Sequence, residues 1–70
     1  MEEIEFQLTS EYIELIKLLK LLRIAESGGQ AKQLVENGEV ILNDDIEYRK
    51  RAKLKSGDKI EIFNYRVIIK

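Results

Sequence analysis

The apolar residues change their spacing at Gly38, and this change constrains the fold more than any other feature of the chain. Before Gly38 they recur at the spacing of a helix face, at Tyr12, Ile13, Leu15, Ile16, Leu18, Leu19 and Leu22. After it they recur at every second residue, as in a strand with one buried face, beginning with Val40 and Leu42. Helices followed by short strands predict an α+β domain, in which two helices pack on a small, mostly antiparallel sheet.

The first helix is expected to begin near Tyr12. A hydroxyl of Thr9 or Ser10 could accept a hydrogen bond from the free N–H groups of its first turn, as an N-terminal cap does. Leu21 falls outside the main apolar stripe, so the apolar face of this helix should be unusually wide.

The second helix is shorter and has clear signals at both ends. Ser27 and Gln30 have the spacing of a capping box, in which Ser27 caps the helix and Gln30 reaches back to the Ser27 N–H group. The helix should end at residues 37–38, where Gly38 can adopt the left-handed conformation of a C-terminal cap. Its buried side is expected to consist of Ala31, Leu34 and Val35.

Short strands are expected on both sides of the helices. Apolar residues alternate with polar ones at Ile4, Phe6 and Leu8, which predicts an N-terminal strand. Turn residues at 43–45 and 55–58 separate later segments, and residues 46–48 can form a very short returning strand. Two further strands should surround Asn64-Tyr65, with Phe6 and Phe63 in the core; their apolar residues are Ile60, Ile62, Val67 and Ile69.

The chain has 70 residues without cysteine or histidine, so no disulfide and none of the usual zinc ligands can support it. We expect one domain over residues 1–70, stabilised by an aliphatic core and needing no cofactor. The most apolar stretch, residues 12–24, carries four charges, and the N-terminus is acidic, so neither a membrane span nor a signal peptide is expected. A monomeric, cytoplasmic protein is the simplest expectation.

Side chains suited to catalysis are scarce. Without histidine or cysteine, nucleophilic triads of the Ser-His and Cys-His types are excluded. The adjacent carboxylates of Asp44 and Asp45 lie in a predicted turn, and they would need burial to act as an acid and a base. We therefore expect that the chain is not an enzyme.

The charges are unevenly distributed, although the formal net charge is only −1. Residues 1–14 hold five Glu and no cation, whereas residues 49–55, the basic segment, hold Arg49, Lys50, Arg51, Lys53 and Lys55. Salt screens charges beyond about 8–10 Å, so a basic face can persist in a balanced protein. Phosphate binding is one interpretation of this segment, and a solvated surface loop is the other. Ala52 and Leu54 favour the first, because they would tether the segment to the fold.

The start of the second helix is another candidate contact with anions. Free N–H groups at a helix N-terminus attract phosphate, and here they belong to a segment that comprises Ser27, Gly28, Gly29 and Gln30, followed by Lys32. The two glycines lack the full pattern of a dinucleotide-binding or Walker loop, so close packing is an equally good interpretation. Tyr48, beside Arg49, could stack on a base, but half-buried packing is the expected role.

Residues 27–43 resemble the core of the S-four RNA-binding domain, also called the alpha-L motif. The shared pattern is a Ser that opens a helix, an Ala-basic pair, Leu-Val, and then Gly-x-Val followed by Asn, with Gly-Asp-x-Ile at residues 57–60. The resemblance covers roughly residues 12–63. Within the family, the Ser-Gly-Gly-Gln-Ala-Lys opening and the cluster at residues 49–51 look most like small stand-alone bacterial proteins of the YbcJ/YaaA kind.

This resemblance implies a non-catalytic module that binds structured RNA, either ribosomal or transfer RNA, with the ribosome or an assembly intermediate as a further partner. Two positions depart from the family pattern. Gly28 stands where Arg usually follows the helix-opening Ser, and Asp44 stands where Gly usually follows the turn Asn. The first departure removes one phosphate contact, so Lys32 and the cluster at residues 49–51 must carry more of the binding.

The alternative is a protein-interaction adaptor in ribosome-associated or RNA-processing complexes. The wide apolar face of the first helix and the acidic N-terminal strand could dock a partner protein, and an exposed apolar surface around Leu21 would support this function. We favour the binding of structured RNA. Because aromatic residues are few, recognition of shape and phosphates fits this chain better than sequence reading of single strands.

Overall fold

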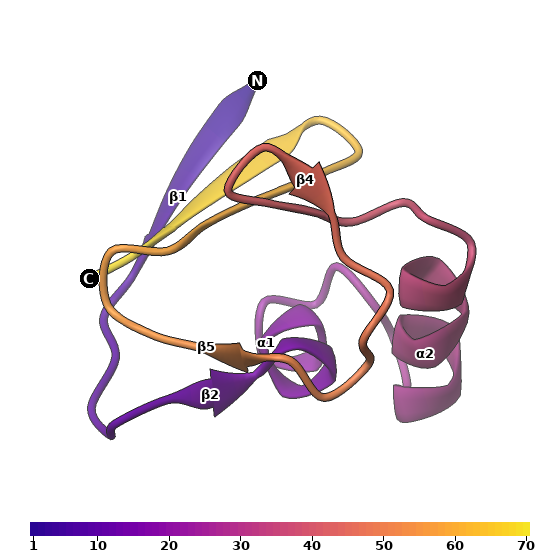
Figure 1. Cartoon of the computed structure of the whole chain (residues 1–70), viewed down its shortest axis with the longest axis horizontal. Coiled ribbons are helices and arrows are strands. Elements are labelled where there is room, and N and C mark those ends of the chain that lie inside the picture. Colours follow the sequence, from indigo (N-terminus) through magenta and orange to yellow (C-terminus); the bar gives the residue numbers. More distant parts are fainter.

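The first and last strands of the chain pair with each other, so both ends of the sequence belong to one sheet (Figure 1). The computed structural model describes all of residues 1–70. Strand β1 (Glu2–Phe6) runs parallel to β7 (Tyr65–Ile69), with Ile4 opposite Val67. The predicted N-terminal strand is therefore confirmed.

The remaining strand pairs are antiparallel. β6 (Lys59–Ile62) pairs with β7, β3 (Ile41–Leu42) pairs with β6, and β4 (Asp45–Ile46) lies at the far edge. The order across the five-stranded sheet is β1-β7-β6-β3-β4. The prediction of a small, mostly antiparallel sheet in an α+β fold is confirmed.

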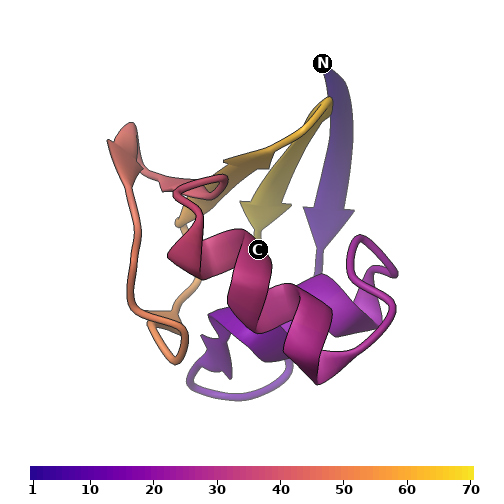
Figure 2. The same cartoon turned by 90° about the vertical axis from the view of Figure 1, so that its right-hand side faces the viewer.

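Two short helices, α1 (Leu15–Leu21) and α2 (Gly28–Glu36), lie on the same side of this sheet (Figure 2). The 15 buried residues are all apolar and form one cluster between the helices and the strands. The helices contribute Leu15, Leu18 and Leu19 from α1, and Ala31, Leu34 and Val35 from α2, as predicted for the second helix. No helix is long and apolar enough to cross a bilayer.

The start of α1 differs from the prediction. Ile13 and Glu14 are extended and form β2 (Ile13–Glu14), which pairs with β5 (Lys53–Leu54), so the helix begins at Leu15. The hydroxyl of Ser10 donates to the Tyr12 carbonyl and caps no helix. Pairing with a distant strand outweighs the helical spacing of the apolar residues here, because it buries Ile13 against the core.

The ends of α2 follow the prediction closely. The Ser27 hydroxyl accepts a hydrogen bond from the Gln30 N–H group at 3.1 Å, and Gly38 adopts the predicted left-handed conformation with φ of 75°. One detail was wrong, because the Gln30 side chain accepts from the N–H group of Glu26 instead of Ser27. The reciprocal cap is therefore shifted by one residue.

The hairpin between β3 and β4 is tighter than predicted. Asn43 and Asp44 both have positive φ, 48° and 77°, the combination that a two-residue type I′ turn requires and that Asn and Asp tolerate. The returning strand therefore begins immediately, as Asp45–Ile46, and ends at Ile46 instead of spanning residues 46–48.

The hairpin between β6 and β7 turns one residue earlier than predicted, at Phe63 and Asn64. Phe63 was predicted to lie in the core, but its side chain is 55% exposed. The error has a simple origin, because the buried strand ends at Ile62 and the following residue belongs to the turn, with φ of 53°. Phe6 packs against the core as predicted, although it is only partly buried.

Candidate functional site

The basic segment, residues 49–55, is a fixed part of the fold. Ala52 is 4% exposed and Leu54 is fully buried. The carbonyl oxygens of Ala52 and Lys50 accept hydrogen bonds from the N–H groups of Leu15 and Ile16, at 2.9 and 3.3 Å. The segment thus caps the start of α1, the role that the sequence had assigned to Thr9 or Ser10. The predicted tethering of the segment to the fold by Ala52 and Leu54 is confirmed.

Four cations of this segment surround one shallow hollow of about 420 Å³, which we call the basic hollow. Its lining consists of Arg49, Arg51, Ala52, Lys53 and Lys55. Ala52 is the only apolar side chain in the lining, and its burial fixes the backbone from which the cations extend. An arrangement of guanidinium and ammonium groups around one concavity suits a phosphate or another anion.

Arg49 is held by a carboxylate that the sequence analysis did not consider. Its Nε and Nη2 atoms donate to the two oxygens of Glu47, each at 3.0 Å, and its backbone N–H donates to the same side chain. The hydrogen bonds from Arg49 lower the pKa of Glu47 below its ordinary value, against the opposing effect of burial. The same contact raises the pKa of Arg49. Because the Arg49 side chain is still 77% exposed, its remaining donors face solvent.

The other cations of the segment differ in their pairing. Lys50 forms an ion pair with Glu36 of α2, with 3.1 Å between the Nζ and Oε2 atoms. Arg51, Lys53 and Lys55 form no ion pair, and the Lys53 ammonium lies 4.9 Å from the centre of the Tyr12 ring. Three of the five cations therefore keep their charge uncompensated by a neighbouring carboxylate.

Of the residues predicted to bind RNA at the second helix, only Lys32 lies on the side of α2 that the basic segment reaches. Lys32 and Glu36 lie one turn apart on α2, and the Lys50–Glu36 ion pair brings the basic segment to that side of the helix. The glycine-containing start of α2 is not in this contact, because it lies at the other end of a nine-residue helix that is about 13 Å long. Lys32 therefore lies on the side of the basic segment, while Ser27, Gly28, Gly29 and Gln30 form a separate region.

Lys20 is a cation that the sequence analysis placed only on the outer side of the first helix. Its Cδ atom lies 3.9 Å from the position that a Cβ atom on Gly28 would occupy. This contact places the alkyl chain of Lys20 beside the start of α2, and Lys20 forms no ion pair. Only the packing of α1 against α2 brings the two together, and the sequence carried no signal for that packing.

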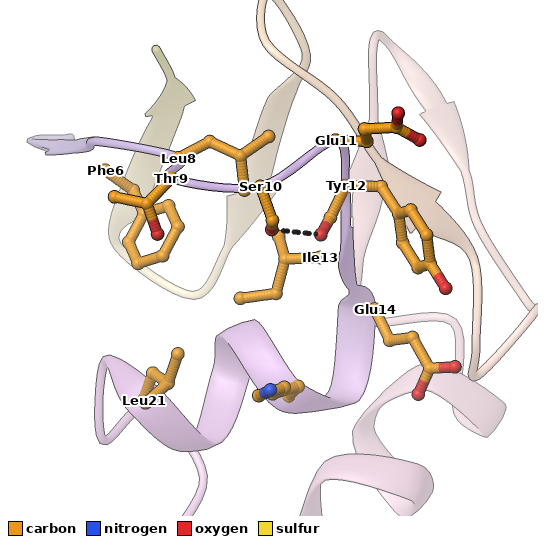
Figure 3. A pocket seen from close by; sticks show the side chains of 10 residues that line it. Phe6, Leu8, Thr9, Ser10, Glu11, Tyr12, Ile13, Glu14 and Leu21 are labelled. Carbon is orange, nitrogen blue, oxygen red and sulfur yellow. Dashed lines mark hydrogen bonds between the residues drawn. The ribbon is translucent and has the colours of Figure 1, made fainter.

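A second hollow, the apolar hollow, lies between the end of β1 and the outer side of α1 (Figure 3). It has a volume of about 480 Å³, and its apolar lining comprises Phe6, Leu8, Tyr12, Ile13 and Leu21. Leu21 is 56% exposed, in agreement with its position outside the apolar stripe. Glu11, Glu14 and Lys17 contribute the charged part of the lining.

Comparisons with known proteins identify the family. The model of the S4 domain matches residues 6–70, and the chain belongs to this family. "Probable ribosome maturation protein RlbA" of Bacillus subtilis is 42% identical over 53 residues, which are 76% of this chain and 75% of that protein. YbcJ of Escherichia coli K12 is 38% identical over 56 residues, 80% of each chain. The resemblance inferred from the sequence is confirmed.

The solved structure of a relative has the same fold. The solution structure of YbcJ from E. coli superimposes with a TM-score of 0.65 and 31% sequence identity, and the match covers 97% of this chain and 87% of YbcJ. That protein is described as having an alpha-L motif involved in RNA binding. The alpha-L arrangement of two helices on a mostly antiparallel sheet is therefore confirmed for this chain.

Proposed function

We propose that this chain is a non-catalytic module that binds structured RNA through the phosphate groups of the RNA backbone. The observation that carries the proposal is the basic hollow, in which four cations extend from a backbone held by buried side chains. Cations that are already fixed lose less conformational entropy on binding than those of a mobile loop. The alpha-L motif involved in RNA binding that is described for YbcJ supports the same function.

The five cations of the basic segment are expected to contribute unequally to the affinity for RNA. Arg51, Lys53 and Lys55 contact phosphates directly, because no carboxylate competes for them. Arg49 contributes the donors that Glu47 leaves free, with its guanidinium already oriented. Lys50 must first exchange Glu36 for a phosphate, so it adds less to the affinity.

The start of α2 provides a second, weaker contact. The hydroxyl of Ser27 and the side chain of Gln30 are engaged in capping, so the N–H groups of Gly28 and Gly29 are the donors that remain for a phosphate. Lys20 beside Gly28 and Lys32 one turn further along α2 both lack a carboxylate partner, and they add positive charge near this contact.

Ribosomal RNA is the kind of RNA that we favour over transfer RNA. The similarity to RlbA, which is named for ribosome maturation, supports a ribosome or an assembly intermediate as the partner. We further propose that the binding species is a cytoplasmic monomer, and the single core cluster, formed within one chain, is consistent with the monomer.

The affinity for RNA should fall steeply with salt. If four cations of the basic hollow each neutralise one phosphate, log K should decrease with log salt at a slope of about −3. Raising the salt from roughly 50 to 200 mM should then weaken binding by roughly a hundredfold, because each released counterion gains less entropy in a more concentrated solution. The measurement is a titration of total ribosomal RNA and of a random duplex RNA across a salt series.

The comparison between the two RNAs separates specific from generic attraction. Tighter binding to ribosomal RNA at every salt concentration supports the proposed partner. Equal and weak binding to both RNAs would show that the basic hollow provides only general electrostatic attraction, and the proposed function would have to be abandoned.

Protein docking is a second candidate function, and the apolar hollow is the observation that favours it. We expect Leu21→Lys to leave RNA affinity within about twofold of the parent protein, because Leu21 lies outside the basic segment and is largely exposed. If the variant keeps full RNA affinity but no longer supports growth in a strain that depends on this protein, the apolar hollow serves a partner protein. Full growth would argue against docking there.

A further inference from the structure

Tyr48 is an exposed aromatic side chain that belongs neither to the core nor to the lining of either hollow. It is 61% exposed, so the half-buried packing expected from the sequence was wrong. Its ring rests on the end of α2, where the Oη and Cε1 atoms lie 3.3 and 3.4 Å from the position that a Cβ atom on Gly38 would occupy. The ring atoms nearest to that position are at the hydroxyl edge, and most of the side chain faces solvent.

The backbone on both sides of Tyr48 is held in place. The N–H group of Glu47 donates to the Val40 carbonyl at 2.9 Å, and the N–H group of Arg49 donates to the Glu47 side chain at 3.0 Å. Lys50, two residues further, is tied to α2 through Glu36. A ring supported in this way loses little freedom when a ligand covers it.

The position of the ring relative to the cations suggests its ligand. Tyr48 directly precedes Arg49, the first cation of the basic hollow, so both side chains extend from the same short stretch of backbone. Neighbouring side chains of an extended chain point to opposite sides, so an RNA strand that crosses this stretch can place a phosphate on Arg49 and a base on the ring. Exposed aromatic rings beside cationic grooves are the platforms on which unpaired bases stack. A duplex offers no free base face, whereas a bulge or loop does.

We propose that Tyr48 stacks on one unpaired base of the bound RNA while Arg49 and the basic hollow hold the neighbouring phosphates. This inference rests on the proposed RNA-binding function and makes it more specific. The RNA partner is a helix interrupted by a bulge or a loop, and Tyr48 selects the interruption. The cations supply affinity for any RNA backbone, and the ring supplies the preference for an unpaired base.

Two RNA hairpins that share the same compact tetraloop with fully stacked bases, and that differ only by a single bulged adenosine in the stem of one, test the inference by titration at constant salt. The parent protein should bind the bulged hairpin at least about fivefold more tightly, the effect of one stacked base. Tyr48→Ala should remove this preference and leave the affinity for the unbulged hairpin unchanged. Tyr48→Phe should retain the preference, because the hydroxyl contributes no stacking.

Phe63→Ala is the matched control. Phe63 is also an exposed ring, 55% against 61%, but it lies in the turn between β6 and β7, well apart from the basic segment in Figures 1 and 2. The preference for the bulge should survive this change. A preference that is absent in the parent protein, or that persists in Tyr48→Ala, would overturn the inference.

The failure of this inference and the failure of the proposed function give different results. Equal, salt-dependent binding of both hairpins keeps the proposed function and rejects stacking on Tyr48. Absence of binding to either hairpin rejects both. Loss of affinity for both hairpins in Tyr48→Ala, with an unchanged circular dichroism spectrum, would mean that the ring positions the basic segment instead of selecting a base.

Discussion

Replacing Arg49, Lys50 and Arg51 together by Glu is expected to weaken binding to ribosomal RNA by at least about a hundredfold near physiological salt. Each phosphate contact releases about one counterion, and the change removes two of the four contacts of the basic hollow together with the weaker contact of Lys50. The three new carboxylates then repel the RNA as well. The salt slope should become shallower, from about −3 to about −1.5, because Lys53 and Lys55 remain, and this change identifies the loss as electrostatic.

The fold should survive this triple change, because the three side chains are exposed or half-buried and the residues that anchor the segment remain. Two ion pairs with Glu47 and Glu36 are lost and replaced by repulsion, but exposed pairs contribute only about 0–1 kcal/mol each to stability. A thermal unfolding curve of the variant separates a loss of binding from a loss of structure.

A matched control is available on the sheet. Lys59, Arg66 and Lys70 are also three cations, and each forms an ion pair, with Asp44, Glu61 and Glu5. Changing all three to Glu gives the same net charge as the triple change in the basic segment. If this control lost RNA affinity to the same extent, binding would depend on net charge alone, and the basic hollow would not be the site.

The second helix shows which structural features a sequence of this kind reveals. The cap at Ser27 and the left-handed Gly38 could be predicted because their partners lie within a few residues along the chain. The start of α1 could not, because its N–H groups are satisfied by carbonyls of the basic segment, far away in the sequence. Local capping signals at Thr9 and Ser10 were outweighed by a pairing that only the folded chain creates.

The charges of the candidate site were also only partly predictable from the sequence. The cluster of cations was evident from the sequence. The number of cations that stay unpaired was not, because Lys50 reaches Glu36 only when the segment packs beside α2. The partner of Arg49 was accessible in principle. Glu47 lies two residues before Arg49, and in extended backbone such residues project to the same side. That local signal went unused in the sequence analysis.

The core positions illustrate a limit of periodicity. Alternation correctly identified Ile60, Ile62, Val67 and Ile69 as buried, because strands with one buried face repeat every two residues. It could not show where a strand ends. Phe63 follows a buried residue and is apolar, yet it belongs to a turn, and its hydrophobicity suggested a burial that the chain geometry does not allow.

Leu54 connects stability with function, because it is the fully buried residue within the basic segment. Leu54→Ala is expected to lower the free energy of unfolding by about 2–5 kcal/mol, through lost transfer energy and the cavity left behind. A domain of this length has a total stability of roughly 4–10 kcal/mol, at about 0.05–0.15 kcal/mol per residue. The loss is therefore a large part of the total and should be visible in urea unfolding followed by circular dichroism.

The change at Leu54 should also reduce RNA affinity, although every cation remains. Leu54 pairs with Ile13, and this pairing holds the carbonyls that cap α1 and the backbone of the basic hollow. Leu21→Ala is the control: it removes the same atoms from a side chain that is 56% exposed, and stability should change by less than about 0.5 kcal/mol. If Leu54→Ala lost stability but bound RNA as tightly as the parent protein while folded, the cations would not need a fixed backbone. Binding that weakens even under conditions where the variant is fully folded would show instead that the hollow depends on this anchor.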